Sequence, residues 1–140
     1  WSDGGAMSAW AITQTNRFGA AVVGAGVTNL YSFHGTTDIT PTFLSKYLRD
    51  VPYLRPEAYR NKSAVQFARN ASTPTLVLHG EEDARVPVGQ AYELYHGLVQ
   101  TGTHAELVVY PREGHAFEEI RHQIDLVDRI TSWFDRYLGE

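Results

Sequence analysis

The stretch Thr75-Leu76-Val77-Leu78-His79-Gly80 decides the fold. A short apolar run that ends at a glycine is typical of a strand buried inside a sheet. Residues 88–100 follow with the apolar spacing of an amphipathic helix, and residues 106–110 form a second apolar strand that Pro111 ends. A strand, a helix and a strand in this order predict a βαβ unit with parallel strands.

The sequence before this stretch shows the same alternation. Residues 4–16 have helical spacing of apolar side chains, and residues 20–27 are a nearly uninterrupted run of small apolar residues. Such a run predicts a strand buried on both faces. The middle of the chain, 28–72, is less regular, and we expect a helix around 41–49 and a short helix within 56–69.

A long amphipathic helix is predicted at the end of the chain, over 119–138. Its apolar side chains recur at helical spacing along one stripe, and they are Ile120, Ile124, Val127, Ile130, Phe134 and Tyr137. We find no internal repeat and no low-complexity linker. The sequence therefore predicts one α/β unit over residues 1–140, with a mostly parallel sheet of about three strands flanked by helices.

The composition excludes several classes of protein. The chain has 140 residues, 43% of them hydrophobic and 20% charged, which is ordinary globular material. The net charge of −4 offers no footprint for nucleic acid and little attraction to anionic lipid. Cysteine is absent, which excludes disulfides, thiolate metal sites and cysteine nucleophiles. We expect no cofactor, no metal, no membrane segment and a cytoplasmic location.

The first residues, Trp1-Ser2-Asp3-Gly4-Gly5, read as a nucleophile elbow. This is a sharp turn between a strand and a helix that exposes a serine hydroxyl, and small residues are needed beside the serine. The bland alternative is a serine in a glycine-rich surface turn. We expect the first glycine of the elbow and the strand that carries the turn to lie before residue 1.

Three polar segments are expected beyond the carboxyl ends of the strands, where catalytic groups lie in such sheets. Ser2 is at the elbow, Asp83 is within 80–87, and His115 is within 111–117. Serine, acid and histidine occur in the chain order of α/β-hydrolases. An imidazole is needed to take the proton of the serine hydroxyl, and a carboxylate fixes its tautomer and stabilises the imidazolium. Ser2, Asp83 and His115 are therefore the candidate catalytic residues.

The tetrahedral oxyanion of this chemistry needs at least two hydrogen-bond donors. One should be the backbone N–H of Asp3, directly after the serine, and the second should come from a loop after an early strand. That loop is not in this sequence.

Other polar residues have competing interpretations. Glu81 and Glu82 are alternatives to Asp83 as the acid. Arg85 could bind a substrate carboxylate with two hydrogen bonds, or it could form a salt bridge that holds its own loop. His79 ends a strand, and a structural role there is favoured. The remaining histidines read as surface or helix-face residues and show no zinc-binding spacing: His34, His96, His104 and His122.

The chain resembles the carboxyl-terminal part of the catalytic α/β-hydrolase domain of the prolyl oligopeptidase family, nearest to the acylaminoacyl-peptidase and dipeptidyl-peptidase type. The matching stretches span essentially the whole chain and are 1–5, 13–15 with Phe18, 35–39, 73–76, 79–87, 109–111 with 113–115, and 133–138. The resemblance implies a serine peptidase, often with esterase activity, in which Ser2 is the nucleophile, Asp83 the acid and His115 the base. The family places Arg-Val-Pro after its acid, which favours Asp83 over its neighbours.

The chain departs from the family pattern beside the nucleophile. The family commonly has a tyrosine where this chain has Asp3, and a carboxylate there could repel the oxyanion or an acidic substrate. Ala6 replaces a frequent aromatic residue and could widen the pocket. The family's β-propeller and its first sheet strands are also missing from this sequence.

Two functions are therefore weighed. The first is a serine hydrolase of short peptide or acyl-peptide bonds, whose isolated 140 residues we expect to be weakly active or inactive. The second is an inert α/β module that acts through self-association or protein binding. Without the early strands, residues 21–27 would form an unpaired apolar edge. We expect either a homo-oligomer or a complementing amino-terminal half on another chain.

Overall fold

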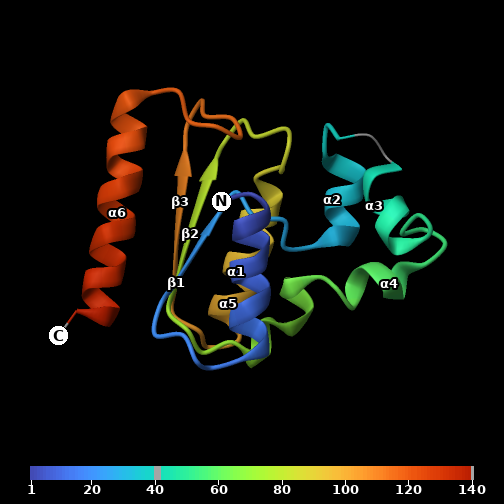
Figure 1. Cartoon of the computed structure of the whole chain (residues 1–140), viewed down its shortest axis with the longest axis horizontal. Coiled ribbons are helices and arrows are strands. Elements are labelled where there is room, and N and C mark those ends of the chain that lie inside the picture. The colour runs from blue at the N-terminus through green and yellow to red at the C-terminus, as the bar shows by residue number, and fades with distance from the viewer. Residues whose placement is uncertain (40–41, 140) are drawn as a thin grey trace.

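Three parallel strands form the centre of the molecule, in the order β1-β2-β3 (Figure 1). They are β1 (Ala21–Gly24), β2 (Thr75–Gly80) and β3 (Ala105–Tyr110). The structure is a computed structural model and describes residues 1–39 and 42–139. Val23 pairs with Val77, and Val77 pairs with Leu107, so the strands are in register across the sheet. The predicted α/β class with about three parallel strands is confirmed.

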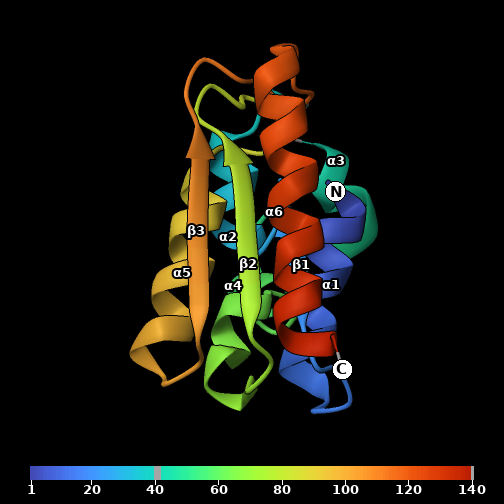
Figure 2. The same cartoon turned by 90° about the vertical axis from the view of Figure 1, so that its left-hand side faces the viewer.

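Helices cover both faces of this sheet (Figures 1 and 2). On one face lie α1 (Asp3–Gln14), the 3-10 helix η1 (Ala64–Asn70) and α5 (Gly89–Gln100). On the other face lies α6 (Ile120–Leu138). A group of short helices extends from the α1 side of the molecule: α2 (Leu30–Thr36), α3 (Thr42–Leu48) and α4 (Pro56–Arg60).

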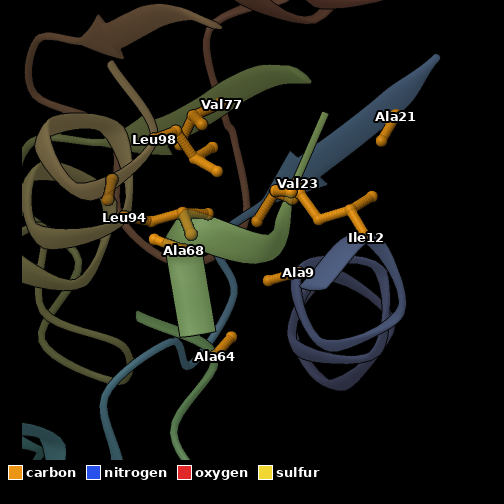
Figure 3. Packing of buried hydrophobic residues seen from close by; sticks show 11 residues of the cluster. Ala9, Ile12, Ala21, Val23, Ala64, Ala68, Val77, Leu94 and Leu98 are labelled. Carbon is orange, nitrogen blue, oxygen red and sulfur yellow. The ribbon is translucent and has the colours of Figure 1, made fainter. Parts of the chain in front are cut away.

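The larger core lies between the sheet and α1, η1 and α5 (Figure 3). Side chains alternate along a strand, so Val23 and Val77 face this layer. Ile12 of α1 meets them from one side, and Leu94 and Leu98 of α5 meet them from the other. This packing holds α1 and α5 against the strands.

The second core lies between α6 and the sheet, and it corrects the predicted apolar stripe in part, because Ile130 and Tyr137 of that stripe lie in this core. Ile120, Ile124 and Val127 are 72%, 58% and 59% exposed. The side that packs on the sheet contains Trp133, which is buried, together with Leu126, Ile130 and Tyr137. Burying the large indole removes more apolar surface from water than burying an aliphatic chain, so the helix turns that side inward.

β1 is shorter than the predicted strand over 20–27. It ends at Gly24, and Ala25 has a φ of 42°, which turns the chain out of the sheet. The amino-terminal end of α1 packs directly on this turn. A Cβ on Gly5 would lie 2.3 Å from the carbonyl oxygen of Gly24, and one on Gly26 would lie 2.7 Å from the carbonyl carbon of Gly5. Glycines are required here because two backbones touch.

The middle of the chain is more helical than predicted. Helix α3 falls within the range predicted around 41–49, although Pro41 lies outside the described residues. Helix α4 and η1 both fall within the predicted range 56–69. Helix α2 was not predicted. Its N-cap is Asn29, a residue type that is preferred at this position, and the side chain of Asn29 accepts a hydrogen bond from the N–H of Tyr31 at 3.1 Å. Among the helices of the described ranges, none is long and apolar enough to cross a membrane.

Candidate active site

Three segments meet at the carboxyl edge of the sheet. Ser2 precedes α1, and its backbone N–H donates to the carbonyl oxygen of Gly24, at the end of β1, at 2.9 Å. Asp83 follows β2, and His115 follows β3. The parallel strands end at the same edge, so their loops are neighbours although the residues lie far apart in the sequence.

The backbone of Ser2 has the conformation of a strained turn. Its φ is 57° and its ψ is −120°, at the N-cap of α1. A positive φ is unfavourable for a residue with a side chain, and such strain costs on the order of 1–3 kcal/mol. The bond to Gly24 and the packing of α1 hold this conformation. It lifts the hydroxyl above the end of the sheet, as the elbow motif requires.

The structure brings the side chains of Ser2, His115 and Asp83 into one hydrogen-bonded series. His115 Nδ1 lies 2.8 Å from Asp83 Oδ2, and His115 Nε2 lies 3.0 Å from Ser2 Oγ. An ionised carboxylate only accepts, so Nδ1 carries the proton and donates it. In the neutral imidazole, Nε2 then has a free lone pair facing the serine hydroxyl. This geometry allows Nε2 to take the hydroxyl proton.

Asp83 is buried and held as a carboxylate. Burial alone would raise its pKa, but hydrogen bonds from His79, the N–H of Val86 and His115 outweigh burial and lower the pKa below its usual value. The Val86 bond to Asp83 Oδ1 is 2.8 Å. Asp83 therefore faces His115 as an ionised carboxylate.

His79 supports the loop after β2 that carries Asp83 (residues 81–88, the acid loop) through a hydrogen bond to its backbone. Its Nε2 donates to the carbonyl oxygen of Val86 at 2.7 Å and lies 3.5 Å from Asp83 Oδ2. His79 is buried at the end of β2 and faces the larger core. The favoured interpretation was a buried histidine bonded to a nearby loop, and the structure has these contacts.

The loop between β3 and α6 that carries His115 (residues 111–119, the histidine loop) contacts the acid loop through its backbone. The N–H of Glu82 donates to the carbonyl oxygen of Glu113 at 2.9 Å. A Cβ on Gly80 would lie 2.3 Å from the carbonyl oxygen of Gly114, so the two loops approach as closely as a glycine allows. Trp1 adds a contact from the serine side, since its indole nitrogen donates to the carbonyl oxygen of His115 at 2.8 Å.

Two residues of the histidine loop and α6 were missed from the sequence. Glu113 is buried and accepts a hydrogen bond from Nδ1 of His122 at 2.8 Å. His122 was predicted to be a surface or helix-face residue; it lies in the first turn of α6, and its side chain is only 13% exposed. The available signal was the position of His122 in the first turn of the last helix, directly after the histidine loop.

The other charged residues near the acid loop lie outside this series. Glu81 and Glu82 are exposed. Arg85 Nε donates to Asp38 Oδ1 at 2.5 Å, and both side chains are exposed. Thr37 Oγ1 also donates to the carbonyl oxygen of Arg85 at 2.7 Å. The salt-bridge alternative for Arg85 thus has a partner in the structure, on the loop between α2 and α3.

A pocket of about 440 Å³ opens beside the first turns of α1. Asp3 and Ala6 lie on its wall, and its other walls are mainly apolar, with Trp10, Leu30 and Phe33 among them. The backbone N–H of Asp3 is in the first turn of α1, where a helix has no carbonyl of its own to bond. An N–H donor, a hydroxyl and an apolar pocket therefore lie along one short stretch of chain.

Glu113, Glu119 and His122 form a further group whose oxygen and nitrogen atoms lie within 4.8 Å of one another. These atoms already have hydrogen-bond partners. Arg112 and Arg121 both bind the carboxylate of Glu119. We therefore describe the group as a hydrogen-bond network and assign no cofactor or metal to it.

Comparison with known proteins gives consistent relatives. The pattern of the prolyl oligopeptidase family matches residues 1–140. The chain is 38% identical over 140 residues to the uncharacterised peptidase YuxL of Bacillus subtilis (strain 168), covering 98% of this chain and 21% of that protein. It is 31% identical over 147 residues to the acylamino-acid-releasing enzyme of Mus musculus, covering 99% of this chain and 20% of that protein.

A solved structure agrees with these relatives. The uncomplexed acylaminoacyl peptidase of Pyrococcus horikoshii superimposes with a TM-score of 0.89 at 28% identity, covering 99% of this chain and 23% of that one. The sequence thus spans about a fifth of the length of the curated relatives it matches.

Proposed function

Because the chain belongs to the prolyl oligopeptidase family, we propose that it carries the nucleophile, acid and base of a serine hydrolase. The proposed reaction is cleavage of short peptide or acyl-peptide bonds. The observation that supports it most is the series Ser2–His115–Asp83, with hydrogen bonds of 3.0 and 2.8 Å. The mouse relative is an acylamino-acid-releasing enzyme, which supports this class of substrate.

Each side chain has one role in this reaction. Ser2 Oγ attacks the carbonyl carbon while His115 Nε2 takes its proton, and Asp83 stabilises the imidazolium that forms. The carbon–nitrogen bond then breaks, and Nε2 returns the proton to the leaving amine. A water molecule then attacks the acyl-serine while His115 Nε2 takes its proton; the bond between the acyl carbon and Ser2 Oγ breaks, Nε2 returns the proton to Oγ, and the acid is released.

The oxyanion is proposed to bind at the amino-terminal end of α1. The N–H of Asp3 directly follows the nucleophile, which is where this class of site has one of its donors. A second donor normally comes from a loop after an early strand, and loss of one donor costs about 10²–10³ in rate. We therefore propose that the 140 residues alone turn over slowly.

The pocket beside α1 is proposed to receive an apolar side chain of the substrate. Its walls include Trp10, Leu30 and Phe33, and burial of an apolar group there would contribute about 25 cal/mol per Å². Asp3 also lines this pocket, so a negative charge lies close to a bound substrate. We expect neutral substrates to be preferred over acidic ones.

Covalent labelling tests the proposal without requiring turnover. A fluorophosphonate should label Ser2, and Ser2→Ala should abolish labelling, as measured by intact-protein mass. An activated chromogenic ester and an acyl-peptide would then be compared with wild type, Ser2→Ala and His115→Ala. If the wild type fails to label, or if Ser2→Ala labels equally, the proposal is wrong.

The second candidate function is association through β1, in an inert module. β1 is an edge strand that bonds β2 along one side and receives only the N–H of Ser2 at Gly24 on the other, among the described residues. An apolar groove of about 400 Å³ lies along it, lined by residues that include Val22 and Phe134. Unpaired strand edges favour pairing with another chain. Light scattering tests this candidate, and a monomer at high concentration would contradict it.

A further inference from the structure

The segment that carries His115 has no regular secondary structure, yet its shape is fixed at both ends. It leaves β3 at Tyr110 and enters α6 at Ile120. Because a loop of this length has many alternative conformations, specific contacts must select the one that aims the imidazole. The backbone bond from Glu82 and the indole bond from Trp1 hold two points of the loop.

A third contact closes the loop on itself. The carboxylate of Glu113 accepts the backbone N–H of Glu118 at 2.8 Å and that of Glu119 at 3.0 Å. These bonds join the two ends of the segment 113–119, and His115 lies inside the closed ring. Nδ1 of His122, in the first turn of α6, adds a third bond to the same carboxylate at 2.8 Å.

The charge on Glu113 is maintained in a buried position. Burial would raise its pKa, but the bonds from Glu118, His122 and Glu119 outweigh burial and lower the pKa below its usual value. Ionised carboxylates form stronger hydrogen bonds than neutral groups do. A buried carboxylate with three donors therefore specifies the loop conformation more tightly than an apolar residue of the same size would.

We propose that Glu113 is the positioning residue for His115, and that it acts by closing the ring 113–119 and anchoring it to His122. The inference rests on the proposed function, in which His115 is the base. Glu113 does not touch the reacting atoms. It fixes the main chain, so that Nδ1 faces Asp83 while Nε2 faces Ser2.

The test compares Glu113→Gln with Glu118→Gln in the 140-residue protein. The glutamine at 113 keeps the size of the side chain but loses the charge and one acceptor oxygen. Glu118→Gln is the matched control, since it makes the same chemical change in the same loop and leaves the backbone N–H that Glu113 accepts. Urea unfolding measures the stability of each variant separately.

The first readout is the proton on His115 Nδ1, observed by NMR. Wild type and Glu118→Gln should show a far-downfield, exchange-protected resonance that Asp83→Asn removes. Glu113→Gln should broaden or lose it. This readout needs no reaction, so it tests the positioning role even if Ser2 proves unreactive and the proposed function fails.

The second readout is the rate of fluorophosphonate labelling of folded protein. Glu113→Gln should label between about tenfold and 100-fold more slowly, because a misplacement of about 1 Å in a site can cost about 10² in rate. Glu118→Gln should label at the wild-type rate. If Glu113→Gln loses stability but keeps both the resonance and the labelling rate, the proposal is overturned.

A variant pair at His122 keeps the test decisive if Glu113→Gln fails to fold. His122→Phe keeps a ring against Tyr110, whose centroid is 5.5 Å away, but removes the donor to Glu113. His122→Gln keeps an N–H donor. The phenylalanine variant should weaken the Nδ1 resonance and slow labelling, and the glutamine variant should restore both. Equal behaviour of the two variants would overturn the proposal.

Discussion

The indole nitrogen of Trp1 donates a hydrogen bond to the backbone carbonyl oxygen of His115 at 2.8 Å. The residue before the proposed nucleophile thus holds the main chain of the proposed base. The same ring packs edge-on against Phe117, with centroids 5.1 Å apart, and a Cβ on Gly24 would lie 2.1 Å from it. The serine turn and the histidine loop are therefore coupled directly.

Replacing Trp1 by phenylalanine should slow labelling of Ser2. Trp1→Phe keeps a ring but loses the donor, and one hydrogen bond contributes about 0.5–1.5 kcal/mol. Since 1.36 kcal/mol is tenfold in rate, labelling should fall by about two- to 13-fold. Trp133→Phe is the control, because the buried indole nitrogen of Trp133 has no hydrogen-bond partner in the described part of the chain. Equal slowing in both variants would contradict this prediction.

Among the acidic residues of the loop after β2, only Asp83 should be needed for reactivity. Asp83→Asn keeps the shape but can no longer fix the tautomer of His115, and the equivalent change in a serine protease triad costs about 10⁴ in kcat. Ester turnover or labelling should fall by about 10³–10⁴. Glu82→Gln, at an exposed neighbour, should keep the wild-type rate. A large loss in Glu82→Gln would show that the acid is misassigned.

The free energy of unfolding should fall as the pH is lowered into the carboxyl range. Burial opposes the shift, but hydrogen bonds lower the folded-state pKa of both Asp83 and Glu113. The folded protein then binds fewer protons than the unfolded chain, so these groups stabilise it above the unfolded pKa of about 4. Their contribution is lost as the pH falls through the folded values.

Urea unfolding at pH 7, 5 and 3 would measure this effect, which we expect to be about 1–3 kcal/mol in total between pH 5 and pH 3. Glu113→Gln should be less stable at pH 7 and less sensitive to acid. An acid dependence identical to that of the wild type would contradict the assignment of Glu113 as an ionised buried group.

The sequence was informative where one local rule dominates. The apolar runs at 75–79 and 106–110 predict strands, and β2 and β3 lie there, β2 buried and β3 half-buried. The order of Ser2, Asp83 and His115 along the chain, each after a strand or before a helix, was enough to bring them to one edge of the sheet. Parallel strands leave little choice about where such loops meet.

The sequence was less informative where packing chooses between similar options. The residues of α6 carry two apolar stripes, and only the sheet decides that the one with Trp133 turns inward while Ile124 stays exposed. The end of β1 depends on the approach of α1 to Gly24, which no local pattern encodes. The hydrogen bond of His122 to Glu113 could not be predicted, because the two residues become neighbours only when the loop folds back.

We expect Arg85 to hold its own loop through the salt bridge with Asp38, and not to bind substrate. Arg85→Gln, Asp38→Asn and the double variant should then have similar, small effects on labelling, because the pair is exposed and screened. The Michaelis constant for a peptide with a free carboxylate should change no more in Arg85→Gln than in Asp38→Asn. A selective rise in Arg85→Gln would instead assign Arg85 to substrate binding.

Adding one methyl group at Gly80 should separate the two loops. A Cβ there would lie 2.3 Å from the carbonyl oxygen of Gly114 and 2.4 Å from that of Glu113, and backbone atoms cannot swing aside. Gly80→Ala should therefore cost about 1–3 kcal/mol of stability, as overpacking does. It should also slow labelling of Ser2, because the histidine loop must move.

Gly89→Ala is the matched control, since its Cβ meets nothing within 4 Å at the start of α5. That change should be neutral or stabilising by about 0.4–1 kcal/mol. Urea unfolding measures the stability of both variants, and fluorophosphonate labelling measures the reactivity of Ser2 in each. A Gly80→Ala protein as stable and reactive as Gly89→Ala would show that the two loops are not in contact.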